Sequence, residues 1–250
     1  MLNYLKAECF KVSRRKYPYL FLLFILLGEA LILFTFWMVN TSTAHNNFDN
    51  TVLVLMVAMP IGLYLAVVVC DMVFSDQYKH NTLKNEVSFG ISRTKLYMGK
   101  LIASVVVALV MLAAIMGFYL LGSLLCMPPG DNTALTMAGL GVSLLASLPL
   151  WLGAVGLTIA LFFNIRSNVG AAFAAVGVIG FLPGALKMAA LLTGNEIFLT
   201  IRSVCLLAPF DNLNTMVEAN GLIGAWLIGM GWLIGSTVIG LLFFQRKEIS

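Results

Sequence analysis

Two ionisable side chains lie inside long apolar stretches, where an ionised group is costly. Glu29 is near the middle of the apolar stretch 19–39, and Lys187 lies in the stretch 169–192. A carboxylate at the centre of a membrane helix costs about 2.5–3.5 kcal/mol on insertion scales, so it should face protein or water. Glu29 therefore either belongs to a substrate path or is a hydrogen-bonded carboxyl that fixes helix packing. Lys187 either pairs with Glu29 over a long reach or extends to the outer surface.

Proline and glycine residues also mark positions inside the apolar stretches. Pro60 interrupts the second stretch, and such a kink either creates a cavity or gate or is simply tolerated. With Glu29 and Lys187, it completes the predicted substrate path. Gly224, Gly231 and Gly235 share one face of the last stretch. A small-residue face allows close helix approach in lipid, either within the chain or between two chains.

The polar loop after the second apolar stretch is more elaborate than a simple tether. Leu83 and Val87 are one helical turn apart among polar residues. Gly90 is suited to end a short helix in a left-handed turn, and Ser92 is placed to cap the next helix. The loop 76–95 is therefore predicted to form a shaped knob of a short helix, a glycine break and the start of a second helix.

Motifs for catalysis by the chain itself are absent from the sequence. The pair Gly99-Lys100 lacks the first glycine and the hydroxyl residue of a nucleotide-binding P-loop. His45 and His80 stand alone, so no metal site is predicted, and there is no G-x-S-x-G nucleophile motif. The cations lie along the edges of apolar stretches without a nucleic-acid-binding signature, so nucleic acid is excluded as a partner.

The amino-acid composition is typical of a membrane protein. Of its 250 residues, 60% are hydrophobic and 10% are charged, against about 45–50% and about 25% in soluble domains. Mean hydropathy is +0.97. The pattern lacks strand-like alternation, so the predicted fold is all-α: one polytopic membrane domain, 1–250, with six transmembrane helices. The six apolar stretches are 19–39, 52–69, 101–126, 136–163, 169–192 and 222–244.

Positive charge predicts the orientation. Lys and Arg concentrate in the first 18 residues, in the loop 71–100, at Arg166 and after residue 244, whereas 40–51 and 127–135 contain none. By the positive-inside rule, both termini lie in the cytoplasm. Residues 1–17 are expected to form an amphipathic interfacial helix. A cleaved signal peptide is not expected, because the first apolar stretch is too long. The segment 194–221 is predicted to be extracellular or re-entrant.

The chain resembles the permease subunits of ABC-2 type exporters, especially short permeases of lantibiotic immunity and antimicrobial-peptide export. The resemblance rests on Lys6, Glu8 and Lys11, on the runs 82–86, 89–93 and 97–101, and on the ending 244–249. It implies a cell-membrane permease exporting antimicrobial peptide or another amphipathic compound. It also implies a separate P-loop ATPase subunit that binds ATP and magnesium, and a second permease chain, identical or paralogous. The implied ATPase-docking residues are Leu83, Lys84, Glu86, Val87, Phe89, Gly90, Ser92 and Arg93.

Two other classes of function stay open at this point. A stand-alone ion-coupled transporter needs ionisable groups in the membrane, and only Glu29 and Lys187 qualify. An intramembrane enzyme needs a convergent set of catalytic groups, and the sequence does not suggest one. For Lys84 and Arg93, a role in membrane orientation is the alternative to pairing with an acidic groove on the ATPase.

Overall fold

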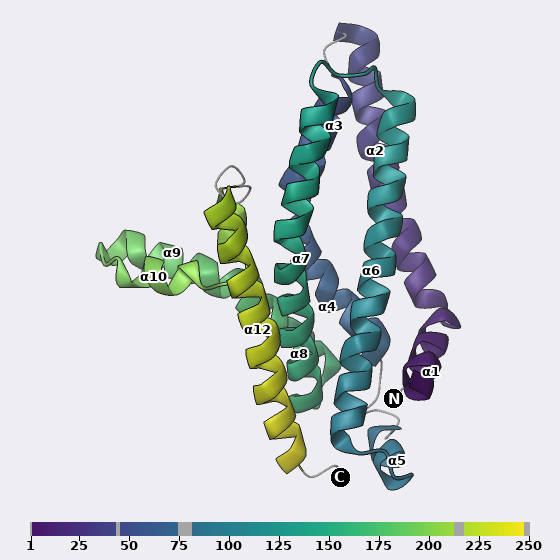
Figure 1. The fold of residues 1–250 in the computed structure, drawn as a ribbon, viewed down its shortest axis with the longest axis vertical. Coiled ribbons are helices and arrows are strands. Elements are labelled where there is room, and N and C mark those ends of the chain that lie inside the picture. Colours follow the sequence, from purple (N-terminus) through teal and green to yellow (C-terminus); the bar gives the residue numbers. More distant parts are fainter. Residues whose placement is uncertain (1, 44–45, 75–81, 213–217, 248–250) are drawn as a thin grey trace.

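The computed structural model describes residues 2–43, 46–74, 82–212 and 218–247, which form helices and turns without a strand (Figure 1). The α-helices are α1 Leu2–Ser13, α2 Lys16–Thr43, α3 Phe48–Ala58, α4 Ile61–Phe74, α5 Thr82–Ser88, α6 Arg93–Cys126, α7 Thr133–Asn164, α8 Asn168–Val176, α9 Leu182–Thr193, α10 Ile197–Ser203 and α12 Ala219–Arg246. A π-helix, η1 Gly177–Phe181, joins α8 to α9, and a 3-10 helix, η2 Ala208–Asp211, follows α10.

The long helices agree with the predicted apolar stretches. Five are long and apolar enough to cross a membrane: α2, α6, α7, the run α8–η1–α9, and α12. Helices α3 and α4 pass the same test together but are bent by 60°, and counting them as one span gives six. The bend lies at Pro60, which cannot donate a backbone hydrogen bond. The ends of the chain, α1 and the last turn of α12, lie at the same end of the bundle (Figure 1).

Helix α7 is the centre of the bundle and the most buried of the five long helices. It packs along α12 through small residues. A Cβ built on Gly229 would lie 2.2 Å from the carbonyl carbon of Pro149, and one on Gly240 would lie 2.6 Å from the Cβ of Ala160. Only glycine permits this approach, which is the usual way that helices gain dispersion contact in lipid. The glycines predicted to share a face are different: Cβ atoms on Gly231 and Gly235 would have nothing within 4 Å.

Helices α9 and α10 form an arm that extends sideways from the bundle (Figure 1). The arm carries exposed apolar side chains, among them Phe181, Leu192 and Ile197. Helix α10 has seven residues and is too short to span. It ends at Ser203. Residues 213–217 of the predicted segment 194–221 lie outside the described residues.

Candidate functional site

The knob predicted after the second apolar stretch has the expected local structure. Gly90 has φ +87°, its N–H bonds the Val87 carbonyl, and the Ile91 N–H bonds the Glu86 carbonyl. These two bonds make a Schellman C-cap for α5. The Ser92 hydroxyl then accepts a bond from the backbone N–H of Lys95, capping α6. Both cap predictions are confirmed. Residues 76–81 of the predicted loop lie outside the described residues.

A network of charges, which we call the buried ion network, joins the knob to α1 and α6. The Nζ of Lys100 lies 2.8 Å from Oε2 of Glu8, and these side chains are 0% and 1% exposed. Lys11 bonds Oε1 of Glu8 at 2.6 Å and Oε1 of Glu86 on α5 at 3.1 Å. The Tyr4 hydroxyl donates to Oε2 of Glu86 at 2.9 Å. Helices α1, α5 and α6 are thus tied by one set of charge-assisted bonds.

Electrostatic interactions within the network favour the charged forms of Glu8 and Lys11. Burial alone raises the pKa of Glu8, but Lys100 and Lys11 outweigh burial and hold that pKa below its ordinary value. Burial lowers the pKa of Lys11, yet Glu8 and Glu86 outweigh it and raise that pKa. Burial and the same two carboxylates raise the pKa of Tyr4, so its hydroxyl keeps the proton that it donates. The Glu8 carboxylate is therefore ionised at neutral pH and the Lys11 ammonium is protonated.

The sequence places α1 against the bundle through its apolar side. Val12 is buried against Val73 of α4 and Ala103 of α6, with Leu5 and Cys9 beside them. Leu5, Cys9 and Val12 lie on the apolar side of the predicted amphipathic helix. Close approach to α6 also requires Gly99, because a Cβ there would lie 2.4 Å from the Tyr4 ring. Location of α1 in the lipid interface stays a prediction.

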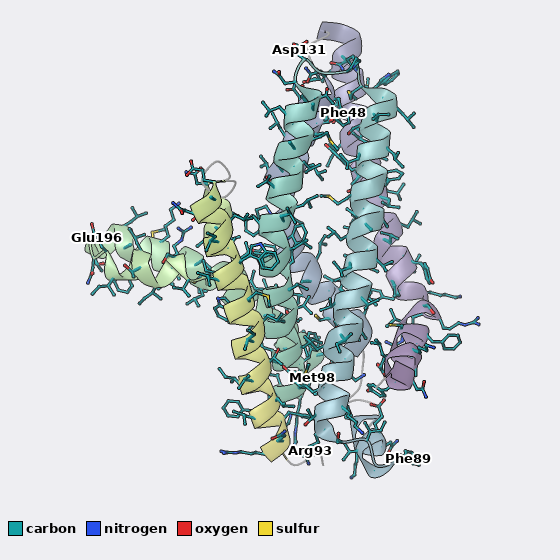
Figure 2. All side chains as sticks on the ribbon, in the orientation of Figure 1. Phe48, Phe89, Arg93, Met98, Asp131 and Glu196 are labelled. Carbon is teal, nitrogen blue, oxygen red and sulfur yellow. The ribbon has the colours of Figure 1, made fainter. Side chains whose placement is uncertain are left out.

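Arg93, at the first turn of α6, holds the end of α12. Its Nη1 donates to the backbone carbonyls of Phe244, Gln245 and Lys247 at 3.0, 2.7 and 2.7 Å, and Figure 2 shows it beside that helix end. These are carbonyls that the helix itself leaves unpaired, and they carry partial negative charge. Gln245 also donates to the Thr94 hydroxyl at 3.3 Å. We call this set of contacts the C-terminal clasp.

Aromatic packing fills the space beneath the clasp. The ring of Phe163 lies 4.6 Å from Phe244, 4.7 Å from Tyr97 and 5.0 Å from Phe74, between ring centroids. All four side chains are fully buried. Edge and offset contacts of this kind add to the dispersion gained by burial. The ends of α4, α6, α7 and α12 that meet at these rings are thereby packed together.

A cavity of about 290 Å³ lies higher in the bundle, beside the break at Pro60. Glu29 lines it, together with Met59 and Gly62 from either side of the break. The indole N–H of Trp151 donates to the Met59 carbonyl at 3.1 Å, and a Cβ on Gly62 would lie 2.5 Å from that nitrogen. Glycine at 62 thus lets Trp151 bond the carbonyl next to the break. Two predicted path elements, Glu29 and the Pro60 kink, do come together.

Lys187, the third predicted path residue, is elsewhere. It is exposed on α9, in the arm that extends from the bundle. No ion pair joins it to Glu29 in the described structure. The long-range pair considered from the sequence is therefore not formed.

Comparison with known families identifies the class of protein to which the chain belongs. The family model described as "ABC-2 family transporter protein" matches residues 4–184, more than half of the chain. The chain belongs to the ABC-2 transporter family. No curated protein matches the sequence. The chain is thus a membrane permease of an ABC transporter; such permeases lack an ATPase of their own and work with an ABC ATPase subunit.

In this ABC-2 permease, the predicted docking residues divide into two groups. Lys84, Phe89, Gly90 and Ser92 are exposed, and Phe89 is 88% exposed at the end of the molecule (Figure 2). The other group points inward or is already bonded: Leu83 is buried, Val87 is half-buried, Glu86 belongs to the buried ion network and Arg93 to the clasp. Docking itself stays a prediction, and the exposed group is where it would occur.

Proposed function

We propose that this ABC-2 permease is the membrane half of an ATP-driven exporter of amphipathic compounds, including antimicrobial peptides. The ATPase docks on the exposed side of α5, and the cytoplasm lies at that end of the bundle. Six spans, with α3 and α4 counted as one, then place both termini in the cytoplasm. ATP and magnesium are held by the partner, and this chain converts the partner's motion into movement of its helices.

The observation that carries this proposal is the contrast between the two sides of α5. Phe89, which directly follows α5, is 88% exposed, and Lys84 on α5 is also exposed. An exposed aromatic with charges around it is typical of an interface anchor. Its inner side is fixed through Glu86 to Lys11 and Tyr4 of α1, and α1 is fixed to α6 through Glu8 and Lys100. A push on Phe89 would therefore move α1, α5 and α6 as one body.

A second permease chain, identical or paralogous, is part of the proposal. Gly231 and Gly235 line an open groove of about 510 Å³ on α12, and a Cβ on either would meet nothing within 4 Å. Gly229, whose Cβ would meet Pro149 of α7, does not line this groove, whereas α7 contributes Leu157 and Ala160 to its wall. The open glycine face and the apolar arm α9–α10 are surfaces that a second chain would cover.

The test is to purify the tagged chain in mild detergent from its native membrane, identify what accompanies it and measure ATP hydrolysis. We expect a P-loop ATPase in the eluate, and we expect Phe89→Ala to remove at least nine-tenths of it. The matched control is Phe173→Ala, which changes an exposed phenylalanine on α8, away from the arm. A chain that elutes without an ATPase, or a Phe89→Ala variant that retains it fully, would refute docking at α5.

A further inference from the structure

The cavity beside Pro60 combines an apolar wall with one charged group. Its lining comes from α2, α3, α4, α6 and α7 and includes Phe24, Leu112 and Trp151. Glu29 is the only Asp, Glu, Lys, Arg or His among the described residues that line it. At about 290 Å³ it is near the lower limit of small-molecule sites, about 300–1,000 Å³. Its chemistry is therefore that of a small site for a ligand with an apolar body and a single polar head.

One carboxyl oxygen of Glu29 has no hydrogen-bond partner among the described residues. Its Oε2 is shielded from solvent and makes no hydrogen bond. The other polar groups of the lining are occupied: the Tyr119 hydroxyl donates to the Thr51 carbonyl at 3.1 Å, and the Trp151 indole donates to the Met59 carbonyl at 3.1 Å. A buried acceptor without a donor costs about 1–3 kcal/mol, so a cationic donor that enters the cavity would be bound in part by removing that cost.

The cavity is beside the outer surface of the bundle. Helix α2 packs mainly on α6 and is the least buried of the long helices, and Phe24 is 73% exposed. A Cβ on Gly28, which also lines the cavity, would meet nothing within 4 Å. A ligand dissolved in the bilayer would therefore reach Glu29 past α2 without first crossing water.

We propose that this cavity binds a single-chain cationic amphiphile, with its ammonium head on Glu29 and its alkyl chain along the apolar lining. A carboxylate in an otherwise apolar site selects positive charge, because burial in low dielectric strengthens the attraction of opposite charges. The identification of this substrate class rests on the proposed export function.

The test uses the permease with its co-purified ATPase in phosphatidylcholine nanodiscs and measures equilibrium binding of radiolabelled dodecylamine, with dodecanol as the neutral probe of equal chain length. We expect dodecylamine to bind at least tenfold more tightly than dodecanol after subtraction of empty discs. Glu29→Gln should remove that preference and leave dodecanol binding unchanged. Equal binding of the two probes to the natural chain would overturn the proposal, whatever the variant does.

A second pair of variants separates the cavity from general effects of substitution. Gly28→Leu would fill the cavity and should lower binding of both probes at least fivefold. Gly117→Leu is the matched control, because Gly117 has open space around its Cβ position and does not line the cavity. Unchanged binding in Gly28→Leu would overturn the assignment of the cavity. If the ATPase co-purifies while charge preference is absent, the ligand class fails and the ABC exporter function stands.

Discussion

The end of the bundle that carries α1 and α5 and its middle are built in different ways. At the end, the charged residues Glu8 and Lys100 are paired although buried, and Arg93 bonds two carbonyls of α12 and that of Lys247, which follows it. In the middle, α3 and α4 are bent by 60°, a cavity is open and Glu29 has an oxygen without a partner. The first region is bonded enough to move as a unit, whereas the second is loose enough to change shape. Force would thus enter through the rigid end and act on the loose middle.

At the rigid end, substitution of Lys100 should lower the unfolding free energy most. Lys100→Met leaves the Glu8 carboxylate buried without its main partner, and breaking a buried pair in this way costs about 3–5 kcal/mol. We expect a corresponding loss of unfolding free energy, measured by denaturant titration in detergent. Lys95→Met, on an exposed position of the same helix, is the control and should change stability by less than about 0.5 kcal/mol. The double variant Glu8→Gln/Lys100→Met should recover much of the loss; no recovery would mean that the pair is not the cause.

Removing the C-terminal clasp tests whether the knob and the last span, α12, move together. Arg93→Ala frees three carbonyls at the end of α12, and hydrogen bonds to a charged group contribute about 1.5–3 kcal/mol. We expect a loss of about 2 kcal/mol and a lower ratio of transport to ATP hydrolysis. Arg246→Ala removes an exposed cation from the same helix end and should leave that ratio near normal. If Arg93→Ala keeps full coupling, the clasp has no part in transmission.

The packing of Trp151 in the loose middle depends on the absence of a side chain at Gly62. Gly62→Ala would place a Cβ 2.5 Å from the indole nitrogen of Trp151, so the ring must move and its bond to Met59 is lost. Overpacking of this kind costs about 1–3 kcal/mol, and we expect a shift in Trp fluorescence with a lower melting temperature. Gly117→Ala, at a position with open space, should be neutral or stabilising. An unchanged melting temperature for Gly62→Ala would contradict the packing described at the break.

Acid should weaken the rigid end by a smaller amount. Because the folded pKa of Glu8 is below its ordinary 4.5, the stabilisation by its charge is complete above pH 4.5 and is lost as pH falls through the lowered value. Lys11 has a raised pKa, so its contribution is present below its ordinary 10.5 and lost as pH rises through the folded value. Unfolding free energy measured from pH 7 to 3 should decline below about 4.5, and Glu8→Gln should flatten that decline.

The sequence by itself determined the features that depend on local chemistry. Hydropathy over about 20 residues shows which segments belong in lipid. A proline removes one backbone hydrogen bond from a helix, and Pro60 lies at the bend between α3 and α4, although Pro149 lies inside the continuous helix α7. The turn at Gly90 and the cap at Ser92 were predictable because each bonds its own neighbours in the chain. Glu29 stood out for a similar reason: a carboxyl in an apolar stretch is costly in any membrane fold.

Only the tertiary structure decided which residues meet across helices. Glu8 and Lys100 are 92 positions apart and resembled ordinary surface charges, although Lys100 follows the buried Leu96 by one helical turn. Arg93 was expected to face the ATPase, and its carbonyl partners lie 151–154 positions away. Glycine spacing could not distinguish Gly229, pressed against Pro149, from Gly231, open on the other side. Spacing fixes which residues share a helix face, but the packing of distant helices fixes which face is covered.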